Sequence, residues 1–296
     1  MPVSPHEWVL PEGFLPDEPP DVPVAPKHAA TVALLRSLPG DAGPDGMEVF
    51  LMRRVAGMAF AGGMTVFPGG RVDPRDGDAS VAWAGPAPAW WASAFGCDTA
   101  LARALVCAAV RETFEESGVL LAGRQDDPGH GVVTDAARFR ESRRALESRE
   151  LSLAQFLAEQ RLVLRADLLR PWANWLTPEE ETRRFDTRFF LAVLPEGQQA
   201  DGATSEAAEA GWQSPAAALE QWRAGRVGLL PPTWATLAEL AECGSVRSAL
   251  ATERTIEKLM PRVVRENGTV KIVLPGDPRY AGAHSRLGHV GDHQEP

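Results

Sequence analysis

Three glutamates lie close together in the chain, at Glu112, Glu115 and Glu116. Their i, i+3, i+4 spacing places three carboxylates on one face of a helix. Like charges at that separation repel each other unless a cation neutralises them, and carboxylate oxygens suit Mg²⁺ or Mn²⁺. A solvated acidic helix face is the alternative interpretation. The segment therefore predicts either a divalent-metal site or a charged helix surface.

The residues around the glutamates predict the helix that must carry them. Val106, Val110 and Phe114 recur every four residues and form an apolar face that can pack on a sheet. Asp98 or Thr99 can cap the start of this helix, and Gly118 can end it in the left-handed conformation. We expect a buried helix from about residue 100 to Gly118.

A second segment, residues 67–73, is an apolar run that closes on Gly69 and Gly70. Two adjacent glycines let the backbone approach a ligand closely and expose amides or carbonyls to it. Taken alone, such a segment is a common turn.

Together the two segments resemble the sequence box of the Nudix hydrolase family, Gly-x5-Glu-x7-Arg-Glu-(apolar)-x-Glu-Glu-x-Gly-(apolar). Residues 111–119 match its second half, with Thr113 at an apolar position, and Gly70 matches its start. The resemblance implies an α/β (α+β) fold in which a mixed β-sheet lies between helices. It also implies that the three glutamates bind the metal with the Gly70 carbonyl, and that Arg111 orients them for catalysis.

The box is interrupted in this chain. Gly70 and Arg111 are 41 positions apart (111 − 70 = 41), where an uninterrupted box has 14, so about 27 residues are inserted. Counted back from Arg111, the first glutamate of the box is replaced by Arg103. The resemblance then implies that a contact supporting the helix is lost, while the metal ligands are kept.

An interruption here resembles the Nudix branch that contains the peroxisomal coenzyme A diphosphatase. That branch shares an Arg-Arg pair, a Phe-x-x-Gly segment and a Val-Phe-Pro-Gly-Gly-x-x-Asp run, matched by Arg53-Arg54, residues 60–63 and residues 66–73. The resemblance implies hydrolysis of coenzyme A or acyl-coenzyme A to 3′,5′-ADP and (acyl-)phosphopantetheine. ADP-ribose or NADH as substrate, and a Nudix module that binds a nucleotide without cleaving it, are the alternatives.

Several arginines are candidates for holding substrate phosphates, because guanidinium groups bind phosphate bidentately. They are Arg53, Arg54, Arg71, Arg183 and Arg184. Solvent-exposed charge is the alternative interpretation. Nudix enzymes often supply a further carboxylate from a loop after the sheet, and Glu206, six residues before Trp212, is the candidate for that catalytic role.

The chain is expected to hold one enlarged domain. We predict a proline-rich leader over residues 1–27, a Nudix domain over 28–275 and a polar tail over 276–296. Insertions are expected at about 73–98 and 124–165, with a C-terminal helical extension. The tryptophans of the first insertion either anchor it on the core, which we favour, or stack on a base. The second insertion is interpreted as a lid or as a homodimer surface.

Further elements are expected from hydrophobic periodicity and from capping residues. Strands are predicted at 28–38, 48–53, 119–122, 185–194 and 270–274; helices at 134–150, 152–160, 215–224, 231–243 and 246–259; and a loop at 197–211.

Composition excludes several classes of function. A net charge of −10 argues against binding nucleic acid through a general basic surface. The three cysteines, Cys97, Cys107 and Cys243, form no Cys-x-x-Cys pair, which argues against a zinc site and suits a reducing cytoplasm. No apolar run approaches the ~18 residues that a membrane span needs, so we expect a cytoplasmic enzyme that acts on a small molecule.

Overall fold

The computed structural model describes residues 8–9, 20–38, 46–55, 57, 61–127, 129, 131–204, 207–266 and 269–283. The chain divides into two compact units. The large unit consists of His28–Asn174 and Thr187–Glu257, and the small unit of Met1–Lys27, Trp175–Asp186 and Lys258–Pro296. Both halves of the interrupted box therefore lie in the large unit.

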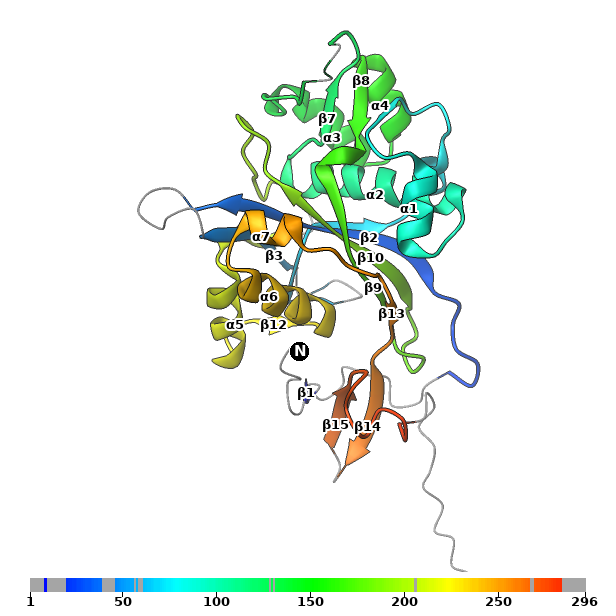
Figure 1. The fold of residues 1–296 in the computed structure, drawn as a ribbon, viewed down its shortest axis with the longest axis vertical. Helices are drawn as coiled ribbons and strands as arrows, with labels where there is room; N and C mark the ends of the chain where they lie inside the picture. Colours follow the sequence, from blue (N-terminus) through cyan, green and yellow to red (C-terminus); the bar gives the residue numbers. More distant parts are fainter. Residues whose placement is uncertain are drawn as a thin grey trace, which may run out of the picture. The chain divides into compact units, whose positions relative to one another are not determined.

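A mixed β-sheet forms the centre of the large unit (Figure 1). Its strand order is β12-β4-β3-β2-β10-β9, with β11 paired to β3 and β5 paired to β2. The strands are β2 (Lys27–Ser37), β3 (Met47–Arg54), β4 (Met64–Val66), β5 (Gly69–Arg71), β9 (Leu169–Leu176), β10 (Phe185–Val193), β11 (Ala207–Gln213) and β12 (Gly228–Leu229). β12 runs parallel to β4, whereas β2 and β3 are antiparallel.

Helices cover both faces of this sheet, which explains why residues 32–35 of β2 are buried on both faces (Figure 1). α1 (Pro88–Phe95) and α2 (Thr99–Ser117) lie on one side. α5 (Pro215–Arg223), α6 (Pro231–Cys243) and α7 (Val246–Ala251) lie on the other. The expected fold class, a mixed sheet between helices, is confirmed.

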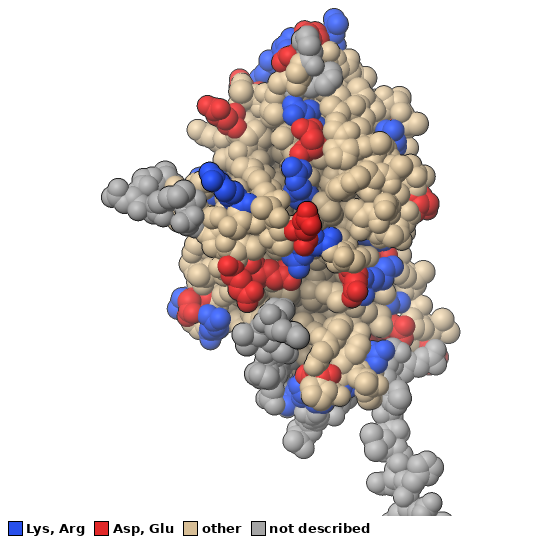
Figure 2. All heavy atoms as spheres, in the orientation of Figure 1, with Lys and Arg blue, Asp and Glu red and all other residues tan. Residues whose placement is uncertain are grey.

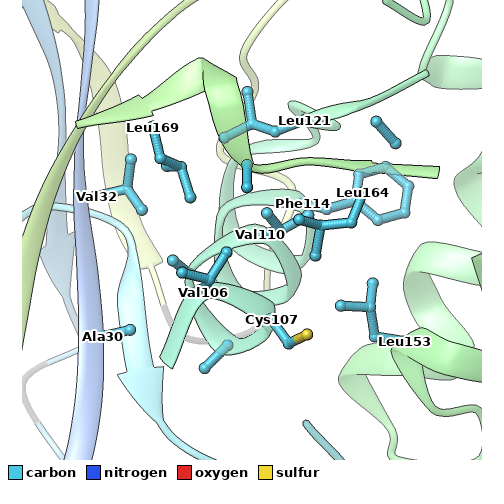
Figure 3. Close-up of a cluster of buried hydrophobic side chains, with 14 of the residues drawn as sticks. Ala30, Val32, Val106, Cys107, Val110, Phe114, Leu121, Leu153, Leu164 and Leu169 are labelled. Atoms are coloured by element: carbon cyan, nitrogen blue, oxygen red, sulfur yellow. The ribbon is translucent and has the colours of Figure 1, made fainter. Parts of the chain in front are cut away.

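The core forms where α2 meets the sheet (Figure 3). Val106, Val110 and Phe114 of α2 are buried in one cluster with Val32 of β2. Phe114 also stacks on Phe156, with ring centroids 5.5 Å apart. Burial of an aromatic or branched aliphatic side chain contributes about 1.5–3 kcal/mol, so this face fixes which side of α2 turns away from the sheet.

The two insertions build a second, smaller sheet in the large unit. Its order is β6-β8-β7, from β6 (Trp83–Ala84), β7 (Ala122–Arg124) and β8 (Leu162–Arg165). Two helices and three 3-10 turns accompany this sheet in the chain. They are α3 (Arg140–Glu147), α4 (Leu153–Glu159), η1 (Pro74–Gly77), η2 (Ala137–Phe139) and η3 (Ala166–Leu168).

Two of the tryptophans of the first insertion behave differently. Trp91 is fully buried against Phe95 and Phe190, as the anchoring interpretation predicts, whereas Trp90 is half-exposed.

The strand expected at 119–122 begins only at Ala122, as β7, and the helix expected at 134–150 begins only at Arg140, as α3 after η2.

Two further predicted elements are wrong. The helix expected at 246–259 ends at Ala251 as α7, and the backbone is extended at Thr252. The β-branched residues Thr252, Thr255 and Ile256 lower the helix propensity of this segment. The loop expected at 197–211 becomes strand β11 from Ala207, because pairing with β3 gives this weakly apolar segment a backbone partner.

The small unit holds a three-stranded sheet of order β1-β15-β14, from β1 (Trp8–Val9), β14 (Arg262–Glu266) and β15 (Thr269–Val273). The two-residue strand β13 (Lys258–Leu259) opens the C-terminal segment of this unit and is not part of that sheet. The strand predicted at 270–274 is confirmed, and part of the proline-rich leader, β1, pairs with it.

Charged side chains of both signs are interspersed on the face shown in Figure 2. Within the described ranges, no single helix is both long and apolar enough to cross a membrane. The successive helices α1 and α2 pass that test only as a pair, across a bend of 96°.

Candidate active site

Helix α2 carries the glutamates with the boundaries that the sequence predicts. The Asp98 side chain accepts a hydrogen bond from the Leu101 amide (2.8 Å) and caps the first turn. The helix ends at Gly118, whose φ of 73° suits glycine. Thr113, at an apolar position of the box, is fully buried and donates to the Ala109 carbonyl (2.7 Å), so its hydroxyl is satisfied inside the helix.

Arg111 joins the two halves of the box. Its Nη1 donates to Glu112 Oε1 (2.8 Å) and to Glu115 Oε2 (3.2 Å). Its Nη2 donates to the Arg71 carbonyl (3.0 Å), on strand β5, which contains the double glycine. The guanidinium therefore orients two of the glutamates and fixes them relative to β5.

Asp76 holds Arg111 from the other side, and sequence analysis missed it. Its two oxygens accept from Nε (2.9 Å) and Nη2 (3.0 Å) of Arg111 in a bidentate pair. Asp76 stands six positions after Gly70 (76 − 70 = 6), where the box places its first glutamate. Counting forward from the glycine, instead of back from Arg111, would have found it. The expectation that a contact supporting the helix is lost is therefore wrong, because Asp76 makes that contact. The insertion lies between Asp76 and Arg111.

The double glycine meets the other glutamates directly. The Gly69 amide donates to Glu116 Oε2 (2.6 Å). A Cβ on Gly70 would lie 2.4 Å from Glu112 Oε1, so only glycine allows this approach. The backbone of β5 therefore approaches Glu112 and Glu116 directly through its two glycines.

Burial and crowding change the proton affinities of these groups. Burial raises the pKa of Glu112 to about 7; Arg111 opposes this rise, and Glu115 adds to it. Burial likewise raises the pKa of Glu115. For Arg111, burial acts to lower the pKa, but Glu112 and Asp76 outweigh it and raise the pKa above its usual range. Three carboxylates, those of Asp76, Glu112 and Glu115, are bonded to this one guanidinium, which leaves an excess of negative charge.

This excess fits a divalent cation. The donor set of Glu112, Glu115 and Glu116 is all oxygen, and Gly70 leaves room that a Cβ would fill. As arranged in the described part of the chain, no three His, Cys, Asp or Glu side chains already converge as a metal site. Binding a cation would therefore require the carboxylate oxygens to converge more closely than they do here.

Three of the candidate arginines lie in the large unit. Arg53 is exposed on β3 and lies 3.5 Å from Glu209 of the paired strand β11. Arg54, next to it, is half-buried. The Arg71 side chain is exposed on β5, while its carbonyl is bound by Arg111. Arg71 is thus the candidate whose backbone contacts the glutamate network.

The other two arginines lie in the small unit. Arg183 is exposed. Arg184 is buried and donates to the carbonyls of Val24 (3.0 Å) and Thr177 (3.1 Å). The Arg184 guanidinium therefore serves the packing of the small unit, in contacts that the sequence did not indicate.

Glu206, the candidate catalytic base, lies outside the described residues. The segment before it is held at Asp201, whose amide donates to the Ser117 carbonyl at the end of α2 (2.9 Å). The strand after it places Trp212 against Phe50 and under the Arg36 guanidinium. The chain on both sides of Glu206 is thus anchored to the large unit.

Comparison with known proteins gives concordant similarities. Residues 97–240 match the model of the NUDT19 Nudix domain. Acyl-coenzyme A diphosphatase NUDT19 of Xenopus laevis is 30% identical over 59% of this chain and 50% of its own length. Its Gallus gallus counterpart is 28% identical over 86% of the chain and 79% of its length.

The chain thus spans about half the length of the Xenopus relative. A crystal structure of a Nudix hydrolase from Alicyclobacillus acidocaldarius superposes with a TM-score of 0.60 at 27% identity, over 78% of this chain and 98% of that one.

Proposed function

The chain belongs to the Nudix hydrolase family, and from that premise we propose that it hydrolyses the diphosphate bond of a nucleoside diphosphate linked to a second group. The observation that carries the proposal is the Arg111 network, which links Glu112 and Glu115 to β5, the strand of the double glycine. A structural helix face would have no need of three buried or nearly buried carboxylates around one guanidinium.

Coenzyme A or an acyl-coenzyme A is the proposed substrate, and 3′,5′-ADP and (acyl-)phosphopantetheine are the products. Two relatives at 28–30% identity are named acyl-coenzyme A diphosphatases, and the interruption between Asp76 and Arg111 suits the same branch. Water adds across one P–O bond of the anhydride, so that one phosphate gains the hydroxyl and the leaving phosphate ester gains the proton.

Glu112, Glu115 and Glu116, with the Gly70 carbonyl, would hold Mg²⁺ or Mn²⁺. When bound, the cation offsets the charge of the diphosphate and favours ionisation of water. The protein's own groups hold the carboxylates in place. Asp76 fixes the plane of the Arg111 guanidinium, Arg111 orients Glu112 and Glu115, and the Gly69 amide fixes Glu116. Arg53, Arg54 and Arg71 are the proposed phosphate contacts in the large unit.

A hydrolysis panel tests this function. Purified protein is incubated with Mg²⁺ or Mn²⁺ and with coenzyme A, acetyl-coenzyme A, ADP-ribose or NADH, and the products are identified by mass. We expect 3′,5′-ADP from both coenzyme A substrates at rates well above the turnover of the other two.

The other outcomes separate the alternatives. Preferred cleavage of ADP-ribose or NADH would keep the mechanism and discard the substrate. Tight binding of a nucleotide with no cleavage, in folded protein with metal present, would contradict hydrolysis and favour a binding module.

A further inference from the structure

The end of the glutamate helix is held by a residue of the second insertion. Arg143 of α3 donates from Nε to the Glu115 carbonyl (2.9 Å) and is 94% buried, since its relative exposure is 6%. The last carbonyls of a helix have no partner within the helix, and a cation there also interacts favourably with the helix dipole. Arg143 therefore caps α2 at the backbone of a proposed metal ligand.

The same guanidinium also binds the segment that leads toward Glu206. Arg143 Nη1 donates to Asp201 Oδ1 (2.7 Å), and the Asp201 amide donates to the Ser117 carbonyl (2.9 Å). Asp201 Oδ1 accepts a further bond from the Ala203 amide (3.0 Å). Arg143, the end of α2 and the 201–203 segment thus form a closed set of hydrogen bonds.

Two further observations support a built contact. One turn along α3, Glu147 accepts from the Thr204 hydroxyl (3.2 Å), so the i and i+4 residues of one α3 face hold the same segment. A Cβ on Gly118 would lie 2.8 Å from Arg143 Nη1 and 3.3 Å from Asp201 Oδ2, so the glycine of the box makes room for this pair.

We infer that Arg143, supplied by helix α3 of the second insertion, is a positioning residue for the hydrolysis proposed above. The inference rests on the proposed function. Arg143 sets the axial position of Glu115 and Glu116 through the backbone of α2, and it fixes the segment that precedes Glu206 through Asp201. Arg143 itself contacts neither substrate nor metal.

Isothermal titration calorimetry of Mn²⁺ binding to the full chain tests this role without any turnover. Arg143→Met should weaken Mn²⁺ binding about 10- to 100-fold, the range found when partners of metal ligands are removed. Arg144→Met is the matched control, because it removes the same charge from an exposed position of the same helix and should bind Mn²⁺ like the wild type. The Mn²⁺ affinity of Arg143→Lys should lie between those of the wild type and Arg143→Met. An ammonium group cannot reach the Glu115 carbonyl and Asp201 Oδ1 in the same geometry.

Kinetics on coenzyme A give the second readout. Arg143→Met should lower kcat while KM stays within about threefold of wild type, because the interaction removed acts on the catalytic groups rather than on substrate. Should Arg143→Met fail to fold by circular dichroism, Asp201→Asn tests the same link from the other side and should weaken Mn²⁺ binding in the same direction.

Wild-type Mn²⁺ affinity in folded Arg143→Met, or in Asp201→Asn if Arg143→Met does not fold, would overturn the inference. That result leaves the proposed function intact. A wild-type protein that cleaves nothing would instead overturn the proposed function, and the Mn²⁺ affinities would still decide whether Arg143 positions the glutamates.

Discussion

Arg111 and Asp76 form the most buried ion pair around the glutamates, with side-chain exposures of 11% and 2%. Loss of one partner leaves the other charge buried without compensation, which costs more than the pair contributes. Asp76→Ala should therefore lower the free energy of unfolding by about 3 kcal/mol and reduce hydrolysis, because Arg111 loses the group that fixes its plane. Urea unfolding and coenzyme A turnover measure the two effects.

Asp126→Ala is the matched control for this prediction. Arg124 and Asp126 form a pair with the same bidentate geometry, at 3.0 and 2.9 Å, but on the surface. Water solvates the remaining charge there, so we expect no measurable change in stability or turnover. Equal effects of the two substitutions would show that burial does not govern the Arg111 pair.

Glu116 offers a test of charge separate from shape. Glu116→Gln keeps an oxygen that can accept the Gly69 amide but removes the negative charge. Folding should be unaffected, and turnover should fall by at least about 100-fold, since a carboxylate that binds the cation has no neutral substitute. The readouts are kcat and the thermal midpoint; Glu159→Gln, an exposed carboxylate on α4, should leave both unchanged. Wild-type turnover of Glu116→Gln would remove Glu116 from the metal site.

At the scale of elements, the sequence predicts the helices and strands whose defining contacts are made between residues close together along the chain. Helix α2 follows from the Asp98 cap, the apolar period and Gly118. Strand β11 does not, because its partner β3 is remote in sequence and its own residues are weakly apolar. Asp76 lies 35 positions from Arg111 and becomes its partner only when η1 and α2 pack together. The contacts of Arg143 and Arg184 could not be predicted for the same reason, since the carbonyls of Glu115 and Val24 that accept from them belong to distant segments.

Gly118 allows the backbone and packing contributions at the end of α2 to be separated. Ala at a left-handed position costs roughly 1–2 kcal/mol, and at Gly118 the new Cβ would also press on Arg143 and Asp201. Gly96 is the control, because it ends α1 with φ +60° and a Cβ added there would meet nothing within 4 Å. We expect Gly118→Ala to destabilise the protein more than Gly96→Ala and to be the only one of the two that weakens Mn²⁺ binding. Equal effects would mean that Gly118 serves only the backbone.

For the whole molecule, two carboxyl groups, Asp73 in the large unit and Glu181 in the small unit, respond to pH in opposite directions. In the large unit, the Arg75 guanidinium beside Asp73 holds the pKa of that carboxyl well below its usual range, although burial opposes the shift. A depressed pKa stabilises the fold above the usual pKa of the group and loses that effect as the pH falls. In the small unit, burial raises the pKa of Glu181 from 4.5 to about 7, and Glu180 adds to the rise. A raised pKa stabilises the fold below pH 4.5 and loses that effect as the pH rises to 7.

The small unit should therefore become less stable between pH 4.5 and pH 7, by ~2 kcal/mol for a partly buried carboxyl. Hydrogen exchange of small-unit amides, corrected for intrinsic rates, measures this in the wild type and in Glu181→Gln at the same two pH values. Glu181→Gln should abolish the difference and protect the small unit at pH 7, because a neutral amide carries no charge into the buried site. Glu179→Gln, two residues away, should retain the wild-type pH dependence. A pH dependence that persists in Glu181→Gln would assign it to another group, and an increase in small-unit protection from pH 4.5 to pH 7 would contradict the raised pKa of Glu181 itself.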